Sequence, residues 1–190
     1  HYPLRRQRQM CIRDRGAAVP QLGANAGFGS GEYAVVEADE SDGSFLAFAP
    51  RVLILTNFEA DHLDFHETYA DLRAVTSAFV ARLKEADDGV LVACADDPGS
   101  RELALEAREH GIHTLFYGEH DSADWRIVKD NSDARGAAVT VASPDGKEHA
   151  LSLHVPGRHN VLNALGALIA GVELGFDPAG VTSGLGGFTG

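Results

Sequence analysis

Residues 51–94 read RVLILTNFEADHLDFHETYADLRAVTSAFVARLKEADDGVLVAC, and this stretch decides the fold class. Its two apolar runs, Val52–Leu55 and Gly89–Cys94, have the length and composition of buried strands. Between them, Thr68 is suited to cap a helix that runs to about Leu83. The apolar face of that helix comprises Leu72, Val75, Phe79 and Leu83. A strand, a helix and a second strand in this order predict parallel strands joined by a helical crossover.

The alternation continues on both sides of this unit. Residues 33–38 and 113–117 predict two further strands, residues 44–48 a helical turn, and residues 98–111 a helix that begins at Pro98. Segments 123–129, 137–142 and 149–155 are separated by turn signals and predict a small antiparallel meander. Helices are expected at 157–174 and 177–185. We therefore predict an α/β fold: a doubly wound, mostly parallel sheet with flanking helices, plus a small antiparallel β meander.

The composition is that of a soluble globular protein, with 44% hydrophobic and 23% charged residues. No apolar run is long enough to cross a membrane, and no secretory signal is visible. The two cysteines lack metal-type spacing. The net charge of −12 argues against nucleic acid or an anionic membrane as a partner. We expect a cytoplasmic protein with no nucleic-acid and no membrane partner.

The first fifteen residues differ from the rest of the chain. They hold five of the sixteen Lys and Arg residues and only one acidic residue. A basic nucleic-acid-binding arm is one interpretation of this charge. We favour a non-native or artefactual segment and exclude residues 1–15 from the fold prediction.

Two segments rich in acidic and imidazole side chains each follow a predicted strand. They are Glu37-Ala-Asp-Glu-Ser-Asp42 and Thr56-Asn-Phe-Glu-Ala-Asp-His62. Ligands of open α/β sheets bind at the carboxyl ends of the strands, and carboxylate oxygens suit a hard cation such as Mg²⁺. Each segment alone also fits a solvated turn or a helix-capping segment. Their occurrence after successive strands favours a divalent-metal site.

A third polar segment, Pro156-Gly-Arg-His-Asn-Val-Leu-Asn-Ala164, opens a predicted helix. His159 and Asn163 are four residues apart and therefore lie on one face of that helix. Both side chains carry donors and acceptors that can read a base edge or a ribose. The alternative is a helix start with polar capping residues.

Together, these segments resemble the central-domain motifs of the Mur ligases. The resemblance is carried by residues 37–45 (EADESDGSF), 56–64 (TNFEADHLD) and 156–164 (PGRHNVLNA), and it covers about residues 23–190. The Asp-Glu-Ser-Asp sequence within the first motif is similar to that of the alanine-adding members. The resemblance implies a fold like that of P-loop NTPases and a cytoplasmic ligase of peptidoglycan precursor synthesis. It also implies UDP-N-acetylmuramate, L-alanine and ATP as ligands, and an acyl phosphate as intermediate.

The resemblance assigns roles residue by residue. Glu37 and His62 are expected to be the catalytic, metal-binding residues, each at one of two Mg²⁺ sites that also accept Mn²⁺. His159 and Asn163 are expected to contact the adenine or ribose of ATP. The same motif adds Arg158 and Asn160 as expected cofactor-binding residues. Supporting or substrate-contacting residues are expected at Asn57, Asp39, Glu40 and Ser41.

Three departures from the family pattern stand out. The chain contains no G-x-x-x-x-G-K-[ST] phosphate-binding loop, and the N- and C-terminal Mur domains are expected to lie outside it. Later-acting ligases carry a modified lysine after the motif histidine, whereas no lysine lies between His62 and Lys84, which agrees with the alanine-adding type. We predict a truncated central ATP-binding domain at 16–187 and the start of a linker at 188–190. The chain alone is expected to be inactive.

Three other functions are compatible with parts of the sequence. A ligase that recycles murein tripeptide shares the opening of the first motif. Alternatively, a metal-dependent hydrolase site is compatible with the close spacing of four side chains: Asp61, His62, Asp64 and His66. A non-catalytic regulatory module is favoured only if the basic start is native.

Overall fold

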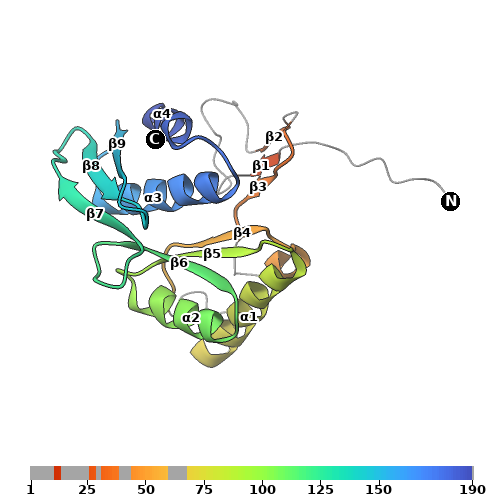
Figure 1. Ribbon diagram of the computed structural model, residues 1–190. Helices are drawn as coiled ribbons and strands as arrows, with labels where there is room; N and C mark the ends of the chain where they lie inside the picture. The colour runs from red at the N-terminus through yellow and green to blue at the C-terminus, as the bar shows by residue number, and fades with distance from the viewer. Residues whose placement is uncertain (1–10, 14–25, 29–30, 39–43, 60–67, 190) are drawn as a thin grey trace. The chain divides into compact units, whose positions relative to one another are not determined.

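The computed structural model describes residues 11–13, 26–28, 31–38, 44–59 and 68–189 (Figure 1). The chain divides into two compact units, His1–Phe45 and Leu46–Gly190. In the first unit, β1 (Cys11–Arg13) pairs antiparallel with β2 (Ala26–Phe28) and parallel with β3 (Val35–Val36). The strand expected at 33–38 is observed, but it is shorter and comprises only the two residues of β3. β1 belongs to the fifteen residues that we had excluded from the fold prediction.

The second unit is built on one six-stranded sheet with the order β4-β5-β6-β7-β8-β9. Neighbouring strands from β4 (Val52–Leu55) through β5 (Val90–Cys94) and β6 (His113–Gly118) to β7 (Trp125–Asp130) are parallel. β8 (Ala137–Ala142) and β9 (Glu148–Leu153) continue the sheet antiparallel. The mostly parallel sheet and the antiparallel meander are both confirmed, and the meander extends the main sheet.

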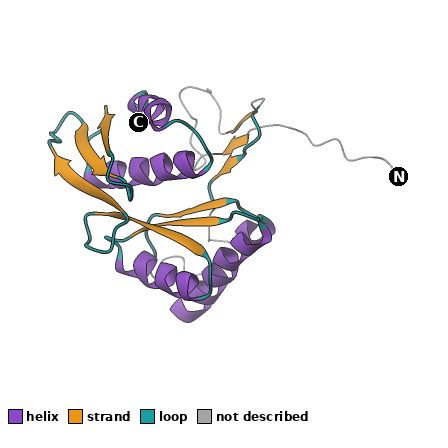
Figure 2. Ribbon diagram, viewed as in Figure 1, coloured by secondary structure: helices purple, strands orange, loops and turns teal. Residues whose placement is uncertain are grey.

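Helices cover both faces of the parallel strands (Figure 2). α1 (Tyr69–Ala81), followed by the 3₁₀ turn η2 (Arg82–Glu85), lies with α2 (Pro98–Glu109) on one face. α3 (Arg158–Glu173) packs against β4, β5 and β6 on the opposite face. α4 (Pro178–Gly186) packs against β9 and α3. A further 3₁₀ turn, η1 (Ser44–Ala47), lies where a helical turn was expected. This arrangement confirms the doubly wound α/β prediction.

β5 illustrates how the core is divided. Leu91 and Ala93 pack into the cluster beneath α1 and α2, whereas Val90, Val92 and Cys94 pack into the cluster beneath α3. All five residues of the strand are buried, as is usual for parallel strands covered on both faces. Because successive side chains of a strand point to opposite faces, an uninterrupted apolar run serves both layers.

The helix starts follow from capping residues in the sequence. Thr68 caps α1 by accepting a hydrogen bond from the backbone N–H of Asp71, as expected. The apolar face of α1 differs in part from the prediction, because Thr76 is buried and Val75 is only half-buried. The Thr76 hydroxyl donates to the carbonyl of Leu72, one turn earlier, which satisfies its polar group inside the core.

No helix in the part of the chain that the structure describes is long and apolar enough to cross a membrane. This finding agrees with the short apolar runs of the sequence. The longest described helix, α3, has 16 residues, whereas a membrane-spanning helix needs about 20 apolar residues.

Candidate functional site

The parallel strands β4, β5 and β6 end on the same edge of the sheet, at Leu55, Cys94 and Gly118. The segments that follow these strands, together with the start of α3, form the candidate site. We call this region the carboxyl edge; its described residues are 56–59, 95–97, 118–124 and 156–163. Ligands of open α/β sheets bind at such edges, because the chain leaves the sheet there and exposes polar side chains and backbone groups.

The structure describes only some of the residues expected to bind metal or to support the metal site. Glu37 directly follows β3 in the His1–Phe45 unit, and it is exposed. Asp39, Glu40, Ser41 and His62 lie outside the described residues. The same holds for Asp61, Asp64 and His66, the other side chains of the alternative hydrolase site. The pairing of Glu37 with His62 therefore stays a prediction.

Asn57 lies at the carboxyl edge, two residues after the end of β4, and its side chain is exposed. Its Oδ1 accepts a hydrogen bond of 3.0 Å from the Thr56 hydroxyl. The next residue, Phe58, is buried beside Leu72 and Leu103. The burial of Phe58 anchors this segment to the helical layer just before the chain enters residues 60–67.

The start of α3 has a backbone conformation that requires glycine. Gly157 has a φ of +108°, and a Cβ atom there would lie only 2.8 Å from the imidazole of His159. The His159 ring thus lies against the backbone of the preceding turn, and the residue is exposed. Asn163, one turn later, is exposed as well. The structure therefore places two of the expected nucleotide-contacting residues on the accessible side of one helix start.

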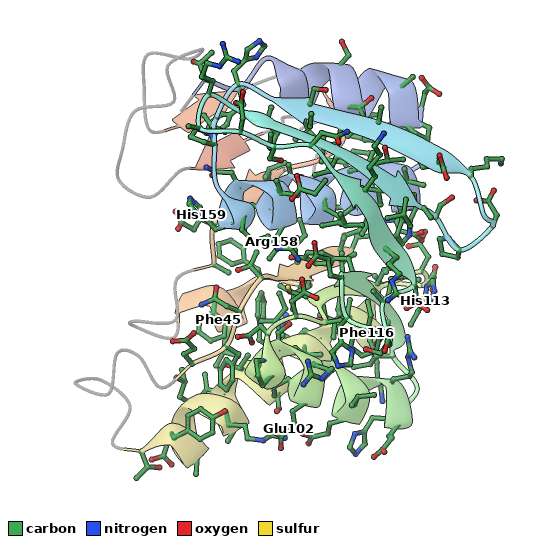
Figure 3. All side chains as sticks on the ribbon, turned by 90° about the vertical axis from the view of Figure 1, so that its left-hand side faces the viewer. Phe45, Glu102, His113, Phe116, Arg158 and His159 are labelled. Carbon is green, nitrogen blue, oxygen red and sulfur yellow. The ribbon has the colours of Figure 1, made fainter. Side chains whose placement is uncertain are left out.

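The other two expected cofactor-binding residues have partners within the protein. Asn160 donates from its side-chain amide to the carbonyl of Pro156 at 2.7 Å, which fixes the first turn of α3. Arg158 forms ion pairs of 2.6 Å with Asp96 and 2.5 Å with Glu119. Their direct contact with a nucleotide stays a prediction. Figure 3 shows Arg158 and His159 together at the start of α3, with His113 at the opposite end of the sheet.

Two consecutive aspartates at the end of β5 organise the carboxyl edge. Asp96 accepts hydrogen bonds from the backbone N–H groups of Glu119 and His120, both at 2.8 Å. Asp97 accepts from the backbone N–H of Ser100 at 2.6 Å, as the N-cap of α2, and from that of Phe58 at 3.0 Å. Sequence reasoning did not single out either residue. The Asp-Pro pair at the start of α2 is the one available signal, and it points to Asp97 alone.

The groups behind the carboxyl edge are buried and neutral. Burial raises the pKa of the Cys94 thiol, and burial likewise raises the pKa of the Tyr117 hydroxyl. The Tyr117 hydroxyl has no hydrogen-bond partner among the residues that the structure describes. Both side chains lie in the core beneath α3. Neither thiolate nor phenolate chemistry is therefore available at neutral pH from these two groups.

Two pockets lie away from the carboxyl edge. One, of about 350 Å³, is lined by residues at the amino ends of β5 and β6, including Gly89, Val90 and His113. The other, of about 310 Å³, lies between α1 and α2. Within the described ranges, no group of three or more His, Cys, Asp or Glu side chains is placed to hold a metal ion. The carboxyl edge remains the candidate site because Asn57 of the second motif and the start of α3, which carries the third motif, both lie there.

Comparisons with known proteins identify the family of this chain. The family model of the Mur ligase middle domain matches residues 17–171. A UDP-N-acetylmuramate–L-alanine ligase of Paenarthrobacter aurescens is 47% identical over 92% of this chain, and one of Mycobacterium marinum is 44% identical over 96%. The chain spans 37% and 39% of the lengths of these two relatives.

A similar fold is found in the crystal structure of the UDP-N-acetylmuramate-alanine ligase from Thermotoga maritima. The TM-score is 0.76 at 25% sequence identity, over 96% of this chain and 39% of that one. The match to the family model extends over most of the chain and includes all three sequence motifs through residue 164. The chain therefore belongs to the Mur ligase family and contains its middle domain.

Proposed function

We propose that this chain is the central part of an ATP-dependent ligase that joins L-alanine to UDP-N-acetylmuramate in peptidoglycan precursor synthesis. The observation that carries the proposal is the 44–47% identity to two ligases of that name over more than nine-tenths of the chain. Because the chain spans less than two-fifths of those relatives, the activity is proposed for a longer protein. We propose the cytoplasm as its location, since ATP and the UDP-linked precursor are cytoplasmic substrates.

The proposed reaction has two steps. A carboxylate oxygen of UDP-N-acetylmuramate attacks the γ-phosphorus of ATP, and ADP leaves with the electron pair of the broken P–O bond. The amine of L-alanine then attacks the carbon of the acyl phosphate, loses a proton and displaces phosphate. Phosphoryl transfer of this kind depends on positioning and charge stabilisation more than on covalent help from the protein. The protein's task is to hold the three substrates in line.

The start of α3 is suited to hold the nucleoside of ATP. His159 and Asn163 are exposed on consecutive turns, and their side chains offer both donors and acceptors to a base edge or a ribose. The His159 ring lies close to Gly157, where the lack of a side chain leaves room for it.

The donor set near the acidic motif fits magnesium in its chemistry. Glu37 is an exposed carboxylate directly after a strand, and carboxylate oxygens are preferred Mg²⁺ ligands. In the proposal, Glu37 and His62 hold two Mg²⁺ ions, or Mn²⁺ in their place, which neutralise phosphate charge when bound. Asn57 is assigned to the supporting shell or to substrate contact, as are three residues of the acidic motif, Asp39, Glu40 and Ser41.

The proposal is tested in the full-length protein that contains this sequence. Glu37→Ala and His62→Ala are each expected to lower kcat/KM for ATP-dependent alanine addition at least about 100-fold, because a transition-state charge stabiliser is lost. Glu102→Ala and His110→Ala are the matched controls, since both residues are exposed on or next to α2. Equal activity of the two pairs of variants would contradict the assigned roles.

Two further experiments test which acceptor is preferred and whether the 190-residue chain is active alone. L-Alanine is expected to be the preferred acceptor; a preference for the murein tripeptide would assign the chain to the recycling ligases. The 190-residue chain alone is expected to show no turnover above its Glu37→Ala variant. Turnover by that chain would contradict the expectation that the activity needs further domains.

A further inference from the structure

The Asp96 carboxylate connects three elements at the carboxyl edge. It lies two residues after the end of β5, and its Oδ1 accepts hydrogen bonds from the backbone N–H groups of Glu119 and His120, in the segment after β6. Its Oδ2 accepts a hydrogen bond of 2.6 Å from an Nη of Arg158, in the first turn of α3. One side chain thus fixes the end of one strand, the exit of the next strand and the start of the helix that carries His159.

The space around this carboxylate is shaped for it. Gly118, the last residue of β6, has a φ of +138°, and any Cβ atom at this position would overlap the Asp96 carboxylate. The side chain of Asp96 is only 21% exposed, so most of its surface is in contact with these partners. Charge-assisted hydrogen bonds of this kind are short and strongly directional.

Arg158 is held from two sides. Its second Nη donates to a Glu119 carboxylate oxygen at 2.5 Å, so the guanidinium spans the exits of β5 and β6. The next residue along α3 is His159, whose ring lies against Gly157. A planar guanidinium with two carboxylate partners fixes orientation better than a single charge contact. The position of the helix start is thereby tied to the strand exits.

We infer that Asp96 is a positioning residue for nucleotide binding, acting through Arg158 on His159. This inference rests on the proposed function. It also gives Arg158 a different role from the expected direct contact with the nucleotide: both ends of its guanidinium are engaged by protein carboxylates. Displacement of a binding group by about 1 Å is enough to lower its contribution severely. Loss of the Asp96–Arg158 contact is expected to release the first turn of α3 in this way.

Asp96→Asn is the discriminating variant, made in the full-length ligase. Asparagine keeps an oxygen acceptor for the two backbone N–H groups but turns an amide toward Arg158. We expect the KM for ATP to rise about tenfold, with the KM for L-alanine and for UDP-N-acetylmuramate unchanged within about twofold. Asp121→Asn is the matched control, because Asp121 lies in the same segment and pairs with the exposed Arg126 at 2.6 Å. A merely structural role would lower kcat and raise all three KM values together.

A double-mutant cycle tests whether Asp96 acts through His159. Asp96→Asn added to His159→Ala is expected to change the KM for ATP by less than about twofold beyond His159→Ala alone. Additive effects would overturn the inference, as would equal KM values in Asp96→Asn and Asp121→Asn. Should Asp96→Asn fail to fold, Arg158→Lys reports on the same contact. Lysine keeps the charge but cannot pair with Asp96 and Glu119 at the same time through two separate N–H groups of a guanidinium.

The same measurements separate the inference from the function on which it rests. A raised KM for ATP in His159→Ala with a normal Asp96→Asn variant contradicts the inference alone. An unchanged KM in His159→Ala contradicts the proposed nucleotide contact and the inference together. Absence of alanine addition by the unsubstituted protein contradicts the proposed function itself.

Discussion

At the scale of single residues, Gly118 provides the sharpest stability test of the carboxyl edge. Its φ of +138° is unfavourable for any residue with a side chain, and the added Cβ atom would overlap the Asp96 carboxylate. We expect Gly118→Ala to lower the free energy of unfolding by about 2–4 kcal/mol, combining backbone strain with a displaced, partly buried carboxylate. Urea denaturation followed by the fluorescence of Trp125 measures this loss.

Gly111→Ala is the control for backbone strain alone. Gly111 has a φ of +79°, and a Cβ atom there would meet nothing within 4 Å. Its substitution is expected to cost about 1 kcal/mol. If both variants lose the same free energy of unfolding, the Asp96 carboxylate can move aside at no energetic cost. That result would contradict its role as a fixed link between strands.

The role of a residue could be predicted from the sequence where a local pattern determined it. Roles that depend on partners distant along the chain were missed. Thr68 was predicted as the cap of α1 because its contact lies three residues away. The role of Asp96 depends on partners 23 and 62 residues away, and no sequence pattern places Arg158 beside it. The roles proposed for Glu37 and His62 likewise depend on the distance between these two residues, and His62 lies outside the described residues.

At the scale of elements, strand and helix types were predictable because core burial imposes simple periodicities. Val52–Leu55 matches β4 in both bounds, since a short apolar run between polar residues has few alternatives. The meander was predicted as a separate feature, whereas β7 in fact joins β6 through the pairs Tyr117–Trp125 and Gly118–Arg126. Such strand pairing is a long-range contact, and turn signals carry no information about it.

The two aspartate caps of this fold allow an element-scale comparison. Asp97 caps α2 and Asp177 caps α4, each followed by proline at the first helical position. Asp97 also accepts a hydrogen bond from the backbone N–H of Phe58, which ties the exit of β4 to α2. We expect Asp177→Ala to cost about 1 kcal/mol and Asp97→Ala about 2–3 kcal/mol, because the latter leaves a second, partly buried N–H group without its acceptor.

Thermal or urea unfolding of both variants measures the difference. The additional loss in Asp97→Ala should fall on the segment after β4, so hydrogen exchange at Phe58 is expected to accelerate in this variant and to stay unchanged in Asp177→Ala. If the two variants lose equal stability and exchange at Phe58 is unchanged, the capping hydrogen bond alone accounts for the contribution of Asp97 to stability.

At the scale of the whole molecule, the hydrophobic core belongs to one of the two units. The buried clusters on both faces of the six-stranded sheet draw all their members from the Leu46–Gly190 unit, within the part of the chain that the structure describes. A unit with its own core is expected to fold independently. Phe45 is buried at 3% exposure and lies just before this unit, so a test of independence should retain it.

A chain of residues 44–190 is therefore expected to unfold cooperatively, with a free energy of unfolding within about 2 kcal/mol of that of the 190-residue chain. Trp125 is the single tryptophan and is buried in the core beneath α3, so its fluorescence reports on this unit in both chains. The shortened chain lacks Glu37, hence the two chains should differ in magnesium-dependent nucleotide binding while sharing one unfolding transition. A large loss of cooperativity on removal of residues 1–43 would show instead that the first unit supplies part of the core, and that the chain folds only as a whole.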